Sequence, residues 1–171
     1  MRRVALFVLL GALLGFGAAA GVRSLGGGDG DGGDGGGGDA VVARYRKDVQ
    51  PILDRGASIV GLGMKPGLSD VSARSLGDDA LIGMTDDWVR ALRTIRGDLD
   101  GLEAKPPVDD AHWLFGRALD AYVQAAEALR AAAGAGDDAA RERLVDLAAS
   151  LGESADALYD RAETTLAALD R

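Results

Sequence analysis

Four segments of the chain carry apolar residues at alternating spacings of three and four, and this pattern constrains the fold more than any other feature. Such spacing places one apolar stripe along each of four helices, and each stripe can leave water only by packing against the others. No segment shows the alternating pattern of a half-buried strand. The sequence therefore predicts an all-α protein, built as an antiparallel four-helix bundle. The stripes are Val42, Tyr45, Val49, Ile52, Gly56, Ile59 and Gly63; Trp88, Leu92, Ile95, Leu99 and Leu102; Phe115, Leu119, Tyr122, Ala126 and Leu129; and Leu144, Leu147, Leu151, Ala155, Leu158, Ala162, Thr165 and Leu169.

Carboxylate residues stand where three of these helices are expected to begin. Residues 85–87 (Thr-Asp-Asp) open the second helix, Asp109-Asp110 the third and Asp137-Asp138 the fourth. Side chains of this kind accept hydrogen bonds from the free N–H groups of a first turn and complement the helix dipole. Pro106-Pro107 and the Gly-Ala-Gly sequence at 134–136 form short connections. Short connections make successive helices antiparallel neighbours.

The stretch from Gly61 to Met84 is the irregular part of the pattern and predicts a crossover between the first and second helices. Pro66-Gly67 is expected to end the first helix, Leu68 to Leu76 to form a short helical piece and 78–84 another turn. Pro51, inside the first stripe, is expected to kink that helix or to mark its true start. A long connection of this kind either serves recognition or only carries the chain along the bundle.

A charge-free segment from Val4 to Val22 follows Arg2 and Arg3. As a helix it would span roughly 28 Å, close to the hydrocarbon core of about 30 Å. The two arginines precede it, and only Arg23 follows closely. The positive-inside tendency therefore predicts a cytoplasmic N-terminus and a body on the far side of the cytoplasmic membrane.

Two interpretations of this segment remain open. It is either an uncleaved single-pass anchor or a signal peptide, because Ala18-Ala19-Ala20 fits the small-residue pattern of a cleavage site. Cleavage after Ala20 would release a secreted protein. Apolar residues continue through Val22, which favours the anchor. Both interpretations place the body outside the cytoplasm.

Glycines spaced one helical turn apart recur in the same segment, as Gly11 with Gly15 and Gly17 with Gly21. Small residues at this spacing let two membrane helices approach closely. A homodimer formed through the anchor is therefore one interpretation, and the ordinary abundance of glycine in membrane segments is the other.

Residues 26–39 are glycine and aspartate only. Such a tract has nothing to bury, and ordering glycine is entropically unfavourable, so it predicts a flexible linker. The chain is thus expected to divide into an N-terminal segment (1–25), a linker (26–39) and an extracytoplasmic body (40–171).

The body is acidic, with 16 Lys and Arg against 23 Asp and Glu from residue 40 on, a net charge of −7. A protein that binds the phosphate backbone needs a positive face, so the composition argues against a nucleic-acid partner. The chain contains no cysteine, which excludes disulfides, thiolate metal sites and a lipidated N-terminal cysteine.

No catalytic, cofactor-binding or metal-binding residues are assigned. His112 is the only histidine, whereas a histidine-based metal site needs further ligands at set spacings, so His112 is interpreted as a surface or partly packed residue. Each aspartate pair coincides with a predicted helix start, which explains it without catalysis. Trp88 and Trp113 are expected in or near the core.

A resemblance supports the same fold and location. The landmarks are Pro106-Pro107, the residues His112-Trp113-Leu114-Phe115, the Ala118-Leu119 pair with Tyr122, and the stretch from Leu151 to Asp160. With them the body resembles uncharacterised membrane-anchored or secreted helical-bundle proteins of actinobacteria. The resemblance implies a helical fold and an extracytoplasmic location, and it implies no activity.

Three functions are compatible with these features. A tethered, acidic bundle without reactive groups favours a non-enzymatic domain that binds a protein or a cell-envelope partner. A bundle that holds or senses a small molecule between its helices is the alternative. A hydrolase, in which His112 would meet a serine and an aspartate, is third.

Overall fold

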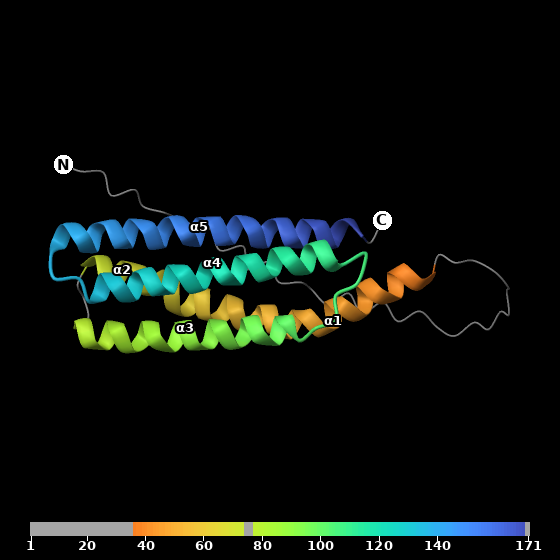
Figure 1. Ribbon diagram of the computed structural model, residues 1–171, viewed down its shortest axis with the longest axis horizontal. Coiled ribbons are helices and arrows are strands. Elements are labelled where there is room, and N and C mark those ends of the chain that lie inside the picture. The colour runs from red at the N-terminus through yellow and green to blue at the C-terminus, as the bar shows by residue number, and fades with distance from the viewer. Residues whose placement is uncertain (1–35, 74–76, 170–171) are drawn as a thin grey trace. The chain divides into compact units, whose positions relative to one another are not determined.

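Helices account for nearly all of the chain that the computed structural model describes, residues 36–73 and 77–169, and these residues include no strand. The four long helices run side by side, and each is antiparallel to the next (Figure 1). The predicted all-α helical bundle is confirmed. The predicted anchor or signal segment and residues 26–35 of the predicted linker lie outside the described residues. The elements are α1 (Gly36–Ile59), a π-helical turn (Val60–Met64), α2 (Lys65–Ala73), α3 (Asp78–Asp100), α4 (Asp109–Ala133) and α5 (Asp138–Ala168).

The helix starts were predicted correctly for α4 and α5. Helix α4 begins at Asp109, and the Asp137 carboxylate accepts a hydrogen bond from the Ala140 N–H at 2.8 Å, capping α5. The predicted start of the next helix upstream was wrong, because α3 begins at Asp78 and Thr85 lies in its interior, fully buried.

Thr85 satisfies its hydroxyl without capping a helix. The hydroxyl donates to the carbonyls of the preceding turn, at 2.9 Å from both Leu81 O and Ile82 O. A threonine whose hydroxyl donates to a backbone carbonyl of the preceding turn can be buried inside a helix. The Asp78-Asp79 pair, and not the residues at 85–87, supplies the negative charge at the start of α3.

The predicted irregular crossover is helical where the structure describes it. After Ile59 the chain widens into the π-turn Val60–Met64, in which the Lys65 N–H bonds to the Val60 carbonyl five residues back, and then continues as α2. Pro66 has no N–H, and its ring would clash with a carbonyl four residues earlier in an ordinary helix. The wider turn lets the chain pass Pro66 without breaking the helix, so the predicted break at Pro66-Gly67 was wrong.

Helix α1 passes through Pro51, so the alternative in which Pro51 marks the start of the helix was also wrong. The helix begins at Gly36, and its first turn overlaps the last four residues of the tract predicted as linker. Asp39 lies in that first turn, where its charge complements the helix dipole.

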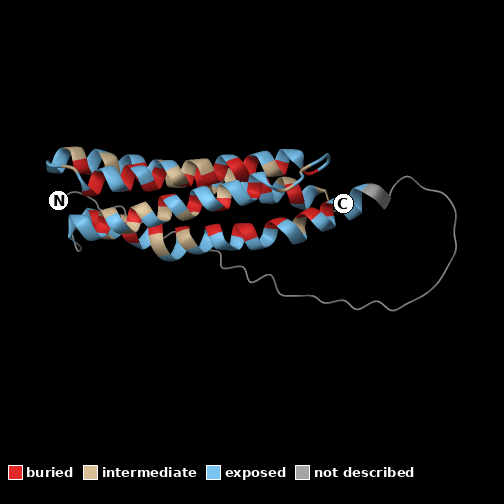
Figure 2. Cartoon of the chain, turned by 60° about the horizontal axis from the view of Figure 1, so that its bottom comes forward, coloured by how far each residue is buried: buried red, intermediate tan, exposed pale blue. Residues whose placement is uncertain are grey.

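Buried side chains gather on the faces that the helices turn toward one another (Figure 2). They form a main core, which draws on α1, the π-turn, α3, α4 and α5, and a smaller end cluster. The end cluster lies where α2 packs over one end of α3, α4 and α5. Its buried members are Val71, Leu81, Ala128, Leu129, Ala132, Ala133 and Ala148.

Helices α4 and α5 pack through alanines. Buried alanines recur every seven residues on α4, at 111, 118, 125 and 132, and on α5, at 148, 155 and 162. Small side chains let two helices approach to the short end of the usual separation of about 8–10 Å. Of the predicted α5 stripe, Ala155 and Ala162 are therefore fully buried in this contact, whereas Leu147 is half exposed.

A buried arginine joins the starts of α3 and α5. Arg141 is only 8% exposed, and its guanidinium lies 3.1 Å from an Asp78 carboxylate oxygen and 3.4 Å from the Ala135 carbonyl. This pair fixes the turn between α4 and α5 against the first turn of α3. Nothing in the hydrophobic pattern predicted it, because Arg141 is a charged residue on an apolar face.

Candidate partner-binding surfaces

The π-turn holds the most exposed of the large apolar side chains in the described residues. Leu62 is 82% exposed, while Val60 and Met64 on either side of it are buried in the main core. Gly61 and Gly63 flank Leu62 directly. The side chain thus stands out from a turn whose two ends are fixed in the core. One exposed leucine is ordinary by itself, but π-turns occur frequently at functional sites.

Trp88 of α3 packs against the backbone of this crossover. A Cβ atom added to Gly63 would lie 2.7 Å from Trp88 Nε1, closer than real Cβ contacts. A Cβ atom on Gly67, one turn later, would also collide with the indole ring, 3.0 Å from Trp88 Cζ3. The two glycines therefore form a flat strip on which the indole lies, and only glycine fits this close approach.

A polar network ties the same crossover to α4 and α5. Lys65, the first residue of α2, places its Nζ 3.3 Å from Oδ2 of Asp156 on α5. The other oxygen of Asp156 accepts a hydrogen bond from the hydroxyl of Tyr122 on α4. Burial of the Tyr122 ring, followed by this hydrogen bond, raises the pKa of the phenol above its ordinary value. Tyr122 therefore stays a hydrogen-bond donor at all physiological pH values.

A second exposed anchor lies in the first turns of α4. Trp113 is 62% exposed, so the expectation that it belongs to the core was wrong. The Arg117 guanidinium lies 5.9 Å from its ring centroid, within reach of a cation–π contact. Trp and Arg dominate the binding energy of many protein interfaces. The first turn of α4 bears Asp109 and Asp110, so any partner here must tolerate negative charge.

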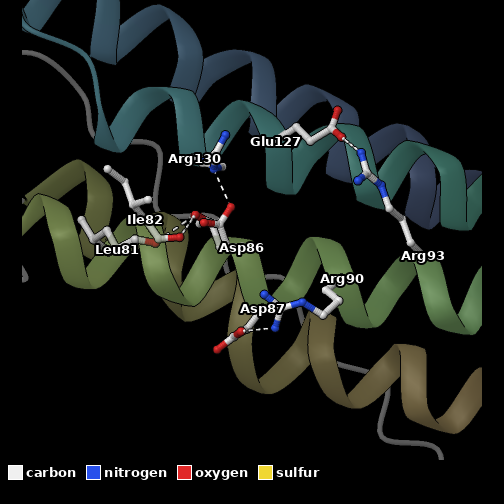
Figure 3. Close-up of polar contacts among 9 residues, drawn as sticks. Leu81, Ile82, Asp86, Asp87, Arg90, Arg93, Glu127 and Arg130 are labelled. Atoms are coloured by element: carbon white, nitrogen blue, oxygen red, sulfur yellow. Dashed lines mark hydrogen bonds and ion pairs between the residues drawn. The ribbon is translucent and has the colours of Figure 1, made fainter.

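The outer face of α3 carries a depression of about 610 Å³ that is open to solvent. Val89 is its buried floor, and the Arg90 guanidinium pairs with the Asp87 carboxylate at 2.8 Å beside it (Figure 3). All of the residues that line the depression belong to α3. Its lining residues are Asp86, Val89, Arg90, Arg93 and Thr94.

Two ion pairs cross from the edge of this depression to α4. Asp86 pairs with Arg130, and Arg93 with Glu127, each at 2.5 Å (Figure 3). All four side chains are about half exposed, so each pair contributes little stability. The arginines of this surface are paired with carboxylates, and two of the pairs connect α3 to α4. The surface therefore has no excess of positive charge that would favour an anionic ligand.

His112 meets a tyrosine and not a serine. Its Nδ1 lies 3.2 Å from the Tyr45 hydroxyl of α1, and the two rings meet edge to face with centroids 5.9 Å apart. Partial burial lowers the pKa of the imidazole below its ordinary value. The prediction of a partly packed histidine is confirmed, and the structure describes no serine hydrogen-bonded to it.

Residues 36–73 and 77–169 contain no group of three or more His, Cys, Asp and Glu arranged to hold a metal ion. Among the same residues, no helix combines the length and the apolar composition that crossing a membrane requires. The apolar segment Val4 to Val22 lies outside that range.

Comparison with known proteins adds no assignment: no family model, no curated protein and no solved structure matches the chain.

Sequence reasoning placed a possible recognition surface in the crossover but did not identify its residues. The sequence did contain a signal for this surface. Gly63 and Gly67 lie one helical turn apart, and two glycines at this spacing leave room for one large side chain against the backbone. Pro66 between them indicated a local change of helix geometry. The bulky partner, Trp88, comes from another helix, and no spacing within the crossover could reveal it.

Proposed function

We propose that this protein is a non-enzymatic, extracytoplasmic helical domain that is tethered to the cytoplasmic membrane and binds a protein or cell-envelope partner. The observation that carries the proposal is Leu62, an exposed apolar side chain on a turn that is itself held in place. An apolar group presented on a rigid support loses little conformational entropy on binding.

Three sets of contacts make that support rigid. Val60 and Met64 enter the main core, the Trp88 ring covers the backbone of Gly63, and the Lys65 ammonium pairs with a carboxylate of α5. A turn fixed on both sides presents Leu62 in one orientation. Such an anchor suits a partner with a preformed apolar pocket.

The proposed location rests on the sequence. The segment Val4 to Val22 would serve as a transmembrane or signal helix, and the Gly/Asp tract would act as a linker of roughly 20 Å that holds the bundle near the membrane surface. An uncleaved segment gives an anchored protein with its N-terminus inside, and cleavage after Ala20 gives a secreted one. The resemblance to actinobacterial envelope proteins fits either form.

Location and binding are tested separately. A reporter that is active only outside the cytoplasm, fused after Arg171, should be active, and sequencing of the mature N-terminus should distinguish the anchored from the secreted form. An inactive reporter would overturn the proposed location.

A photocrosslinking amino acid in place of Leu62, in the full-length protein in its own cell envelope, should give one discrete adduct. The same probe in place of Leu147, a half-exposed leucine on α5, is the matched control. Leu62→Asp should abolish co-purification of the crosslinked partner and leave the melting temperature unchanged. Equal adducts from both positions, or none from position 62, would refute the proposed surface.

A further inference from the structure

We infer that Trp113 of α4 makes a second, reversible contact with the membrane, in which its indole ring enters the headgroup region of the lipid surface that holds the N-terminal segment. The partner is a zwitterionic lipid surface. This inference rests on the anchored form of the proposed function. It does not depend on the Leu62 surface, which serves a different partner.

The side chain of Trp113 has the chemistry that suits the border of a bilayer. It is 62% exposed, although tryptophan usually buries most of its large apolar surface. Tryptophan combines an apolar ring with one N–H donor, and it is enriched where lipid headgroups meet the hydrocarbon core. A lipid surface therefore offers this ring both an apolar layer and polar partners for its edge.

The charges around Trp113 fit a headgroup that carries both signs. The Arg117 guanidinium, one turn further along α4, lies 5.9 Å from the ring centroid. Asp109 and Asp110 lie one turn before the ring. A lipid phosphate can pair with the arginine, and a headgroup ammonium with the aspartates. The acidic body disfavours an anionic membrane, so zwitterionic lipid is the expected partner.

Trp113 lies at the end of the bundle where the chain enters it. The N-terminal half of α1, the start of α4 and the end of α5 lie together at this end (Figure 1). The Tyr45 hydroxyl of α1 lies 3.2 Å from Nδ1 of His112, the residue before Trp113. The Arg46 guanidinium donates to the Leu166 carbonyl of α5 at 2.8 Å. A membrane close to the start of α1 is therefore also close to Trp113.

The linker is long enough for the membrane segment and the ring to contact one surface together. Tyr45 lies about 14 Å along α1 from Gly36, where the helix begins. Residues 26–35, the part of the Gly/Asp tract before α1, would span roughly 17 Å as a flexible coil. A short tether also keeps the ring at an effective concentration on the order of 1 mM, so a weak contact becomes populated.

A second exposed apolar side chain lies at the tethered end. Val41 is 38% exposed and lies one turn before Tyr45 on α1. The other exposed large apolar side chains of the described residues lie elsewhere. Leu62 follows the far end of α1, and Leu147 lies in the first third of α5, which begins where α4 ends. Trp113 and Val41 thus give the tethered end an apolar character of its own, and Leu147 provides a control position.

Fluorescence quenching by brominated lipid tests the contact. The full-length protein is reconstituted into phosphatidylcholine vesicles with bromine near the headgroup end or near the tail end of the acyl chains. The emission of Trp113, taken as the difference between wild type and Trp113→Ala, should be quenched at least about two-fold more by the former. Trp88 should keep its emission, because its ring packs on Gly63 and Gly67. Equal Trp113 emission in brominated and ordinary vesicles would overturn the inference.

A matched control moves the exposed ring to the other end of the bundle. Trp113→Ala combined with Leu147→Trp places an indole at a position that is already half exposed, so the fold should tolerate it. Its emission should not be quenched, because this position lies away from the tether. Equal quenching at positions 113 and 147 would show that the bundle lies on lipid without a specific contact, and would also overturn the inference.

Flotation of the same vesicles separates this inference from the proposed location. Wild type and Trp113→Ala should float alike, because the N-terminal segment holds both in the bilayer. A chain that does not float would refute the membrane anchor, and this inference with it. A chain that floats without quenching of Trp113 would refute this inference alone. A photocrosslinking residue at position 113 should label lipid in the cell envelope, and one discrete protein adduct would assign the surface to a protein instead.

Discussion

Replacing Gly63 by alanine should destabilise the protein, whereas the same change at Gly61, two residues earlier in the π-turn, should stabilise it. In an unstrained position, Gly→Ala restricts the unfolded chain and stabilises by roughly 0.4–1 kcal/mol. A Cβ on Gly61 meets nothing within 4 Å, so this gain should appear in full. A Cβ on Gly63 would lie 2.7 Å from Trp88 Nε1 and 3.1 Å from Cε2.

The magnitude follows from how far the ring must move. Ordinary van der Waals contact begins at 3.4 Å, so the indole or the turn must shift by about 0.7 Å. The indole is a rigid side chain packed on both hydrophobic clusters, and forced shifts of this kind typically cost about 1–3 kcal/mol. The two alanine variants should therefore differ by about 1–3 kcal/mol in free energy of unfolding.

Thermal unfolding followed by circular dichroism measures the difference. For a folded region of this size, 1 kcal/mol corresponds to about 4 °C, so the melting temperatures should differ by roughly 4–12 °C. Trp88→Leu combined with Gly63→Ala should remove most of that difference, because the colliding ring is gone. If Gly63→Ala were as stable as Gly61→Ala, the indole would not lie on this backbone and the argument for a rigid turn would fail.

Three further changes test other parts of the structure. Burial lowers the pKa of His112 below its ordinary value of 6.5, so the unfolded chain binds the proton more tightly than the folded protein does. The free energy of unfolding should therefore fall as pH drops below about 6.5. Urea titrations at pH 5–7 should show this decrease, and His112→Gln should make the free energy of unfolding depend less on pH. Tyr122→Phe removes the donor to Asp156 and should lower stability by about 1–2 kcal/mol in the same assay; an unchanged midpoint would show that this bond contributes nothing. Ala155→Leu should destabilise by about 2 kcal/mol or more by forcing α4 and α5 apart, while Ala157→Leu on the exposed face should change the melting temperature by at most a few degrees; similar effects of the two would contradict the close contact.

The periodic part of the fold could be predicted from the sequence because apolar spacing and helix capping are local. Val42, Tyr45, Val49 and Ile52 are all buried as the first stripe predicts. The starts of α4 and α5 follow from their aspartates. The same rule applied to Asp78-Asp79 would have placed the start of α3 correctly, but Thr85 with its two aspartates gave an equally good local signal.

Thr85 shows why the two signals could not be separated from the sequence. A threonine is favoured at a helix start and tolerated in a helix interior when its hydroxyl bonds to an earlier carbonyl. The outcome depends on whether the threonine is buried, and Thr85 is 0% exposed. Burial is a property of the packed bundle and not of the residues next to Thr85.

The candidate surfaces were less predictable for the same reason. The crossover was recognised as unusual from its composition, but the exposure of Leu62 depends on a π-turn, and that turn depends on how the chain passes Pro66. Trp113 was expected in or near the core because large aromatic side chains are usually buried, and it is exposed. Its neighbours Leu114 and Phe115 are buried instead, and Phe115 is the residue that the predicted stripe places in the core.

The alanine contact between α4 and α5 also shapes the surface that α2 covers. Alanines at 132 and 148 belong to the series that lets the two helices approach closely, and the same residues form part of the floor under α2. A floor of methyl groups offers less apolar area to a covering helix than a floor of leucines would, and burial stabilises in proportion to area. The same alanine series therefore shapes two contacts, the close approach of α4 to α5 and the packing of α2 over the end cluster.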